Sequence, residues 1–207
     1  MRSDAVDQLL TSYLELPVKV SWEGRLADAM RGRLEGVQVE VAGVATAWLP
    51  IERIAVHADC ARFTPGLPAR IRVEAPVVQV TVGQRDLDRW LDGFQLPFRL
   101  RLADGGLVVH TEIAGLALSE FETRLEVVRG WFVLRPQRAT VLGIPNQLAR
   151  LFRTYLPLPP LSPDARLVGI EHARGRLSLH FGISDFEEEV TPGMLVRLRR
   201  RLLPWVG

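Results

Sequence analysis

Polar and apolar residues alternate along most of this chain, with the period of two that is typical of a β-strand with one buried face. The clearest runs in the first half are Val18–Trp22, Val37–Val41, Ile54–Cys60, Ile71–Ala75 and Val78–Val82. The apolar phase shifts past Gly43 and flips at Pro76, which indicates bulges or sharp bends. Strands with such phase changes predict a strongly twisted or curved sheet whose strands cross from one environment into another.

The second half continues the strand pattern with tight turns. Four strands are expected at Phe98–Leu102, Leu107–Leu118, Phe121–Val128 and Trp131–Arg138. Ala103–Gly106 is a good hairpin turn, so consecutive strands should form an antiparallel meander. A closing hairpin is expected from Ala165–His172 and Arg176–Ile183, joined by Gly175.

Helical spacing is confined to short segments. Helices are expected at Ser3–Leu14, Gly24–Arg33, Gly83–Gly93, Pro145–Tyr155 and Thr191–Gly207. Met30 should face inward in the second of these, and Pro145 should occupy the first helical position of the fourth. The sequence therefore predicts an α+β fold in one domain, residues 1–207, with a long, strongly curved antiparallel β-sheet wrapped against a few helices.

Composition adds few constraints on function. The 207 residues are 47% hydrophobic, and 26 Lys and Arg against 24 Asp and Glu give a net charge of +2. The single cysteine, Cys60, excludes an intramolecular disulfide and a cysteine-rich zinc site. Residues 1–16 lack the apolar segment of a secretory signal, and no stretch approaches the ~20 apolar residues of a membrane-spanning helix.

No arrangement of residues is typical of a catalytic or metal site. The four histidines are isolated in strand-like runs, where a solvent-facing or structural role is usual: His57, His110, His172 and His180. Cys60 resembles a small buried hydrophobic residue, and the acidic run Glu187–Glu189 indicates a solvated charged segment. We therefore expect no enzymatic activity, no metal and no cofactor.

The segment Leu156–Val190 carries the most distinctive pattern. Its first part, LPLPPLSP, should be extended because proline fixes φ and lacks an amide donor, and a strand, a turn and a second strand follow. This order of elements resembles that of the LmeA-like phospholipid-binding family of bacteria, whose members end with a leucine-proline motif, a strand, a turn and a final strand. The pair Asp86-Leu87, with Leu91, also fits a short helix that follows a strand in that family.

The resemblance implies a fold similar to tubular lipid-binding proteins, with an apolar groove that holds the acyl chains of phospholipid or a related lipid without catalysis. We expect the groove to be lined by residues already on apolar faces, namely Val78, Val80, Val82, Trp90, Phe132 and Phe152. For each of these an ordinary place in the core is the alternative. Many relatives carry an N-terminal export segment that this chain lacks, so we expect a cytoplasmic protein peripheral to the inner membrane.

The tail, residues 191–207, combines a leucine stripe with arginines. It is expected to be a basic amphipathic helix that contacts the membrane surface through Arg197, Arg199, Arg200, Arg201 and Trp205. A helix packed on the sheet with its arginines in water is the alternative. A nucleic-acid arm is disfavoured, because the rest of the chain shows no basic and aromatic interleaving.

A second function class stays open at this point. The chain could form a structural or protein-interaction β domain with a fully packed core, whose basic tail docks a partner or closes a homodimer. That hypothesis predicts no cavity through the protein and no bound lipid.

Overall fold

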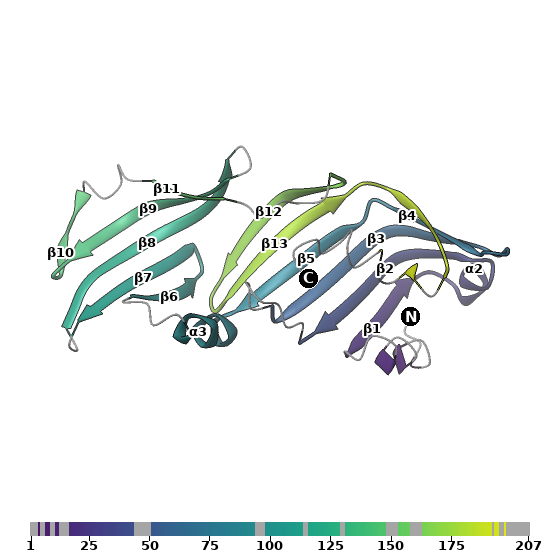
Figure 1. Ribbon diagram of the computed structural model, residues 1–207, viewed down its shortest axis with the longest axis horizontal. Coiled ribbons are helices and arrows are strands. Elements are labelled where there is room, and N and C mark those ends of the chain that lie inside the picture. The colour runs from purple at the N-terminus through teal and green to yellow at the C-terminus, as the bar shows by residue number, and fades with distance from the viewer. Residues whose placement is uncertain are drawn as a thin grey trace.

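Two antiparallel sheets make up the molecule and confirm the expected α+β class with a curved sheet (Figure 1). The computed structural model describes residues 17–43, 51–93, 98–113, 116–128, 131–147, 153–157 and 163–191, and residues 4, 7, 8, 11, 12, 193, 194 and 197 near the ends. Strands account for 65% of the structure, and the helices in the described ranges are short, α2 (Leu26–Met30) and α3 (Gln84–Asp92).

Sheet A has eight strands, and its main path runs β1-β2-β3-β5-β13-β12, with β4 between β3 and β14. Its strands are β1 (Val18–Glu23), β2 (Arg33–Ala42), β3 (Arg53–Thr64), β4 (Arg70–Glu74), β5 (Val77–Gly83), β12 (Ala165–Ala173), β13 (Arg176–Ile183) and β14 (Phe186–Glu189). The expected closing hairpin is confirmed as β12 and β13, which are joined by a turn in which Gly175 has a φ of 75°.

Sheet B has six strands in the order β10-β9-β8-β7-β6, with β11 also paired to β9. They are β6 (Phe98–Ala103), β7 (Gly106–Ile113), β8 (Leu116–Val128), β9 (Trp131–Val141), β10 (Ile144–Pro145) and β11 (Thr154–Pro157). The expected meander is confirmed, but one boundary was wrong. Ile113 pairs with Leu116, so the chain reverses inside the expected strand Leu107–Leu118.

A crease crosses sheet A where three neighbouring strands change the phase of their apolar residues. The register places Gly36 of β2 opposite Asp59 of β3, and Asp59 opposite Ala75, which lies between β4 and β5. Gly36 and Ala75 have φ values of 54° and 47°, in the left-handed region that breaks the alternation of a strand. Leu34 and Val37, on either side of Gly36, therefore pack against the same apolar cluster.

The bend expected at Pro76 is present at Ala75, but it does not carry β4 and β5 into different environments. The N–H of Ala75 donates to Oδ1 of Asp185 at 2.8 Å, which holds the bend. Beyond the bend, Phe186 of β14 pairs with Val73 of β4. Phe186 still packs against the apolar cluster at the centre of sheet A, which includes Val78 and Val80. The phase flip thus keeps apolar side chains on one side of a bent sheet.

Two expectations about helices were wrong. Pro145 lies in β10, where it pairs with Thr140, and Tyr155 lies in β11, where it pairs with Val133. A short apolar segment fits both the helical period of 3.6 residues and the strand period of two, and here pairing with β9 determines the structure of both ends of the expected helix. Residues 148–152 lie outside the described ranges. Met30 is 82% exposed instead of inward, because α2 spans only five residues and covers little of the sheet.

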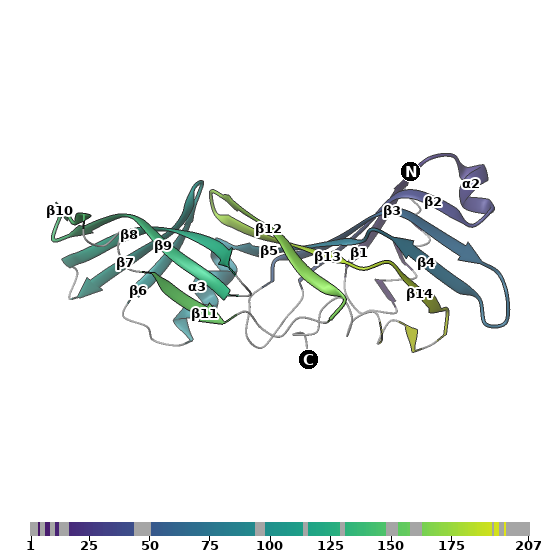
Figure 2. The ribbon, with the colours of Figure 1, turned by 90° about the horizontal axis from the view of Figure 1, so that it is seen from above.

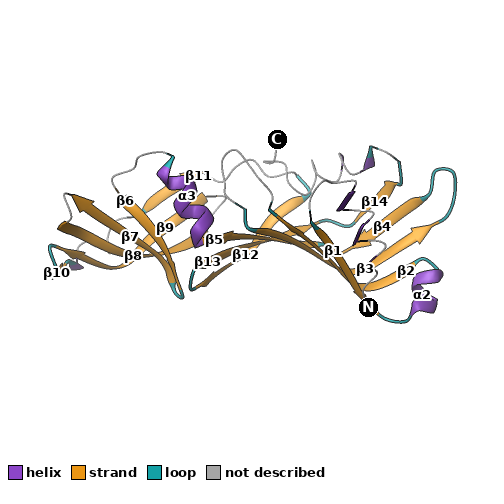
Figure 3. Ribbon diagram, turned by 90° about the horizontal axis from the view of Figure 1, so that it is seen from below, coloured by secondary structure: helices purple, strands orange, loops and turns teal. Residues whose placement is uncertain are grey.

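The two sheets lie end to end along an elongated, arched molecule (Figures 2 and 3). Its accessible surface is 13305 Å², whereas the scaling law for compact proteins gives about 9,700 Å² at this mass. A surface this large is typical of sheets that are not sandwiched between two further layers.

The sheets are joined by α3 and by the turn between β12 and β13. At the start of α3, the Gln84 side chain donates from Nε2 to the carbonyl of Leu100 at 2.8 Å and accepts the N–H of Leu102 at 2.6 Å. The N–H of Gly175 donates to the carbonyl of Leu102 at 3.0 Å. Gln84 therefore takes the place of a neighbouring strand at the edge of sheet B.

Candidate functional site

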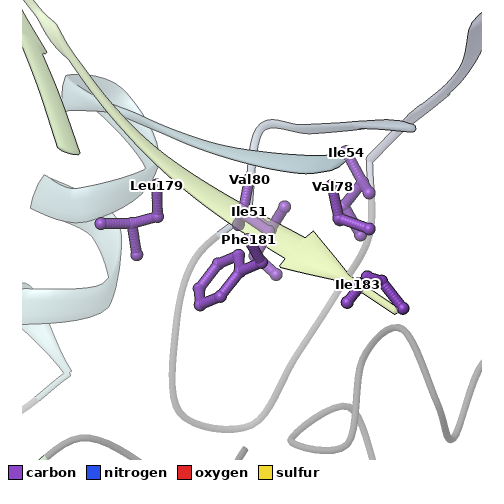
Figure 4. Packing of buried hydrophobic residues seen from close by; sticks show 7 residues of the cluster. All are labelled: Ile51, Ile54, Val78, Val80, Leu179, Phe181 and Ile183. Atoms are coloured by element: carbon purple, nitrogen blue, oxygen red, sulfur yellow. The ribbon is translucent and has the colours of Figure 1, made fainter. Parts of the chain in front are cut away.

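One face of sheet A is apolar over its width because the register aligns apolar residues from adjacent strands. Val80 pairs with Ile54 on one side and with Leu179 on the other, and paired residues point to the same side of a sheet. The intervening residues Gln79 and His180 also pair with each other, on the opposite face. The cluster at the centre of the apolar face consists of Ile51, Ile54, Val78, Val80, Leu179, Phe181 and Ile183 (Figure 4).

Sheet B has the same two-sided character. Leu100 of β6 pairs with Val109 of β7, which pairs with Phe121 of β8, so these three side chains share one face. Glu122 and Arg138, also paired, lie on the other face with their charged groups 3.9 Å apart. One face of sheet B is therefore apolar, whereas the other carries ion pairs and also Val108, which pairs with Glu122 and is 3% exposed.

The apolar faces of the two sheets join without a break. A cluster at the joint combines α3 and both sheets and consists of Val82, Leu87, Leu91, Leu102, Leu107 and Leu125. Ile170 of β12 packs against this joint cluster and also against the central cluster. Val41 of β2 likewise packs against both the central cluster and the cluster of β1, formed by Val18, Val20 and Trp22. We call the whole surface the continuous apolar face.

Exposure differs along this face. Val78 and Val80, at the centre of sheet A, are 0% exposed. Leu100, Val109 and Phe121 of sheet B are only half-buried. The sheet B part is therefore the part of the continuous apolar face that is more open to a ligand.

The structure brings together some of the residues expected to line a groove. Val78, Val80 and Val82 share the continuous apolar face and are 0%, 0% and 2% exposed, which is also what an ordinary core would give. Trp90 of α3 is half-buried and packs against the joint cluster. Phe132 lies in β9, paired with Val127, but its side chain is outside the described set, and so is the whole of Phe152.

The expected tail helix falls mostly outside the described residues, which include Arg197 but not Arg199, Arg200, Arg201 or Trp205. Nε of Arg197 lies 3.0 Å from Oε2 of Glu188, and its Nη2 donates to the carbonyl of Glu189 at 3.1 Å and to Oγ1 of Thr191 at 3.2 Å. These contacts fix Arg197 against the end of β14. The acidic run Glu187–Glu189 lies in the paired strand β14, in which Glu187 and Glu189 are exposed to solvent.

The histidines occupy separate places in the sheets. Nδ1 of His110 lies 3.4 Å from Oε2 of Glu120 on the next strand. Nε2 of His172 is buried and makes no hydrogen bond to the described residues, and burial, together with the charge of Arg124, lowers the pKa of His172. Cys60 is a buried free thiol. Across the described ranges, no three His, Cys, Asp or Glu side chains are grouped to hold a metal ion.

Sequence reasoning missed two features of the site. The first is the open apolar face of sheet B, although the alternation of Leu100 with its polar neighbours carried the signal. The second is a hollow of about 340 Å³ beside the turn between β6 and β7, lined by charged residues that include Arg101, Asp104 and Arg174. The N–H of Arg174 donates to Oδ1 of Asp104 at 2.7 Å across two turns that are 70 residues apart, a contact that local patterns do not predict.

Comparisons with other proteins add no assignment: no family model matches the chain, and no curated protein or solved structure is significantly similar to it. Neither of the described helices is long and apolar enough to cross a membrane.

Proposed function

We propose that this protein binds phospholipid or a related acyl lipid on the continuous apolar face, without catalysis and at the periphery of a membrane. The observation that carries this proposal is that two amphipathic sheets turn their apolar faces to the same side and join through the α3 cluster. The resemblance to the LmeA-like family points in the same direction, and with it to the inner membrane as the place of action.

The energetics favour an elongated apolar ligand on this surface. Transfer of an acyl chain from water gains about 0.8 kcal/mol per buried CH₂ group, so an apolar strip suffices without specific polar contacts. The half-buried side chains of Leu100, Val109 and Phe121 would lose their remaining contact with water when such a chain lies on them. Sheet B is therefore where the proposal places the first contact with the acyl chain.

Substitutions on the two faces of sheet B distinguish lipid binding from general destabilisation. Leu100→Asn and Phe121→Asn place an amide on the apolar face, whereas Arg99→Asn and Glu120→Asn introduce the same residue on the same strands but on the other face. The purified proteins are extracted with organic solvent, and bound lipid is identified by mass spectrometry after circular dichroism has verified the fold. We expect stoichiometric phospholipid in the wild type and in the two controls, and loss of lipid from the two apolar-face variants.

A protein-interaction β domain with a packed core is the second candidate. The complete burial of Val78 and Val80 favours it, because a surface that is already covered needs no ligand. A lipid-free extract from the wild type, with no uptake of added phospholipid, would reject the lipid proposal. In that case the interaction domain, with docking of a partner or a second copy, would take its place.

A further inference from the structure

Three large apolar side chains are exposed at the end of sheet A that lies farthest from sheet B. Leu67 lies in the turn between β3 and β4 and is 105% exposed, Met30 ends α2 and is 82% exposed, and Phe63 is 44% exposed. The N–H of Phe63 donates to the carbonyl of Gly32 at 2.6 Å, which ties the turn after α2 to β3. In Figures 1 and 2, α2 and the turn between β3 and β4 both lie at the right-hand end of the molecule. We call Met30, Phe63 and Leu67 the distal tip.

A row of arginines crosses the sheet directly behind this tip. Arg33 of β2 pairs with Arg62 of β3, and Arg62 pairs with Arg72 of β4. Like charges directly opposite one another destabilise a sheet, so the row depends on acids beside it. Glu35 lies 2.8 Å from Arg33, and Glu74 lies 3.7 Å from Arg62 and 3.6 Å from Arg72.

The spacing between the arginine row and the tip matches the polar layer of a bilayer. From the row at Arg62 and Arg72 the ladder runs two residues further, to Thr64 and Arg70. At about 3.4 Å per residue this is ~7 Å, and Leu67 lies in the turn beyond it. The polar region of a bilayer is about 5–8 Å thick on each side. A tip that reaches the hydrocarbon therefore leaves the guanidinium groups among phosphates, to which arginine binds in bidentate fashion.

We propose that the distal tip enters a phospholipid bilayer, with Leu67, Met30 and Phe63 among the acyl chains and the arginine row in the headgroup layer. This deepens the proposed function and rests on it, because the tip adjoins the continuous apolar face: Ala29, next to Met30, packs against the cluster of β1. A bilayer suits the tip better than a protein partner. Its apolar side chains come from separate segments at a protruding end.

The chain supplies a matched control at its other end. Leu142 lies in the turn between β9 and β10 at the far end of sheet B and is 69% exposed. Cys60 is only 8% exposed, so Leu67→Cys and Leu142→Cys can each be labelled selectively with an environment-sensitive fluorophore. With vesicles of phosphatidylcholine, alone or mixed with phosphatidylglycerol, we expect a blue shift for the label at position 67 and none at position 142. A shift at position 142 alone, or at neither position, would overturn the inference.

Vesicle flotation of the full-length chain gives a second readout. Loss of one fully exposed leucine side chain from the hydrocarbon should weaken binding of Leu67→Ser to the same vesicles about tenfold, and Leu142→Ser should bind as the wild type does. Uptake of a soluble short-chain phospholipid by the same variants separates this inference from the proposed function. Leu67→Ser should still take up this lipid, because the apolar face is intact. Unchanged vesicle binding by Leu67→Ser rejects the tip, and absent uptake by the wild type rejects the lipid proposal itself.

Discussion

Replacing Gln84 with alanine should destabilise the protein through loss of the joint between the two sheets. The amide of Gln84 satisfies the carbonyl of Leu100 at 2.8 Å and the N–H of Leu102 at 2.6 Å, on the edge strand of sheet B. A buried backbone group left without its partner costs about 1–3 kcal/mol. Because this site is only partly buried and water can replace some of the contact, we expect a loss of roughly 2–4 kcal/mol in the free energy of unfolding.

Urea unfolding followed by circular dichroism measures this loss. Gln38→Ala is the matched control, because its amide donates to the exposed Glu40 side chain at 3.0 Å and to no other residue in the described ranges. Its removal should cost less than about 0.5 kcal/mol. Gln84→Glu keeps the acceptor but replaces the donor with an oxygen facing Leu100 and the carboxylate of Asp88, so it should destabilise at least as much as alanine. If Gln84→Ala stays within 0.5 kcal/mol of the wild type (about the size of a neutral surface change), the joint does not depend on this side chain.

Two further predictions concern the crease and a buried histidine. Ala75 has a φ of 47°, a conformation that costs energy for alanine but not for glycine. Ala75→Gly should therefore stabilise the protein by up to about 1 kcal/mol, after the larger entropy of glycine in the unfolded chain is subtracted. A lower melting temperature for this variant would contradict the reasoning. Burial and the charge of Arg124 lower the pKa of His172 below its ordinary 6.5, so the folded state favours the neutral imidazole. The stability that depends on neutral His172 is fully present above pH ~6.5 and is lost as the pH falls below this value. Between pH 7.5 and pH 5.5 the urea midpoint of His172→Gln should therefore fall less than that of the wild type. Equal falls in the two proteins would show that His172 does not cause the loss of stability at low pH.

Local patterns in the sequence determined most of the strands. Period-two alternation and turn residues place β6, β9 and the closing hairpin to within a few residues, because a half-buried strand must alternate and a tight hairpin needs residues such as Gly175. The bend near Pro76 was also visible, since a phase flip has no other simple origin in a strand. The helix α3 followed from the spacing of Leu87 and Leu91, which are both buried.

Only the tertiary structure decided which edges pair and what the faces do together. The segment Pro145–Tyr155 has helical spacing, yet both of its ends form strands that pair with β9. The backbone groups of β9 that these strands satisfy lie outside the segment, so its own pattern of residues does not predict this pairing. The sequence likewise shows that Leu100 and Val80 each lie on an apolar face. It does not show that these faces adjoin, because their meeting depends on hydrogen bonds from Gln84 and Gly175 to β6, which join residues that lie far apart in the sequence. The continuous apolar face is therefore a property of the joint between the sheets, and local periodicity carries no information about it.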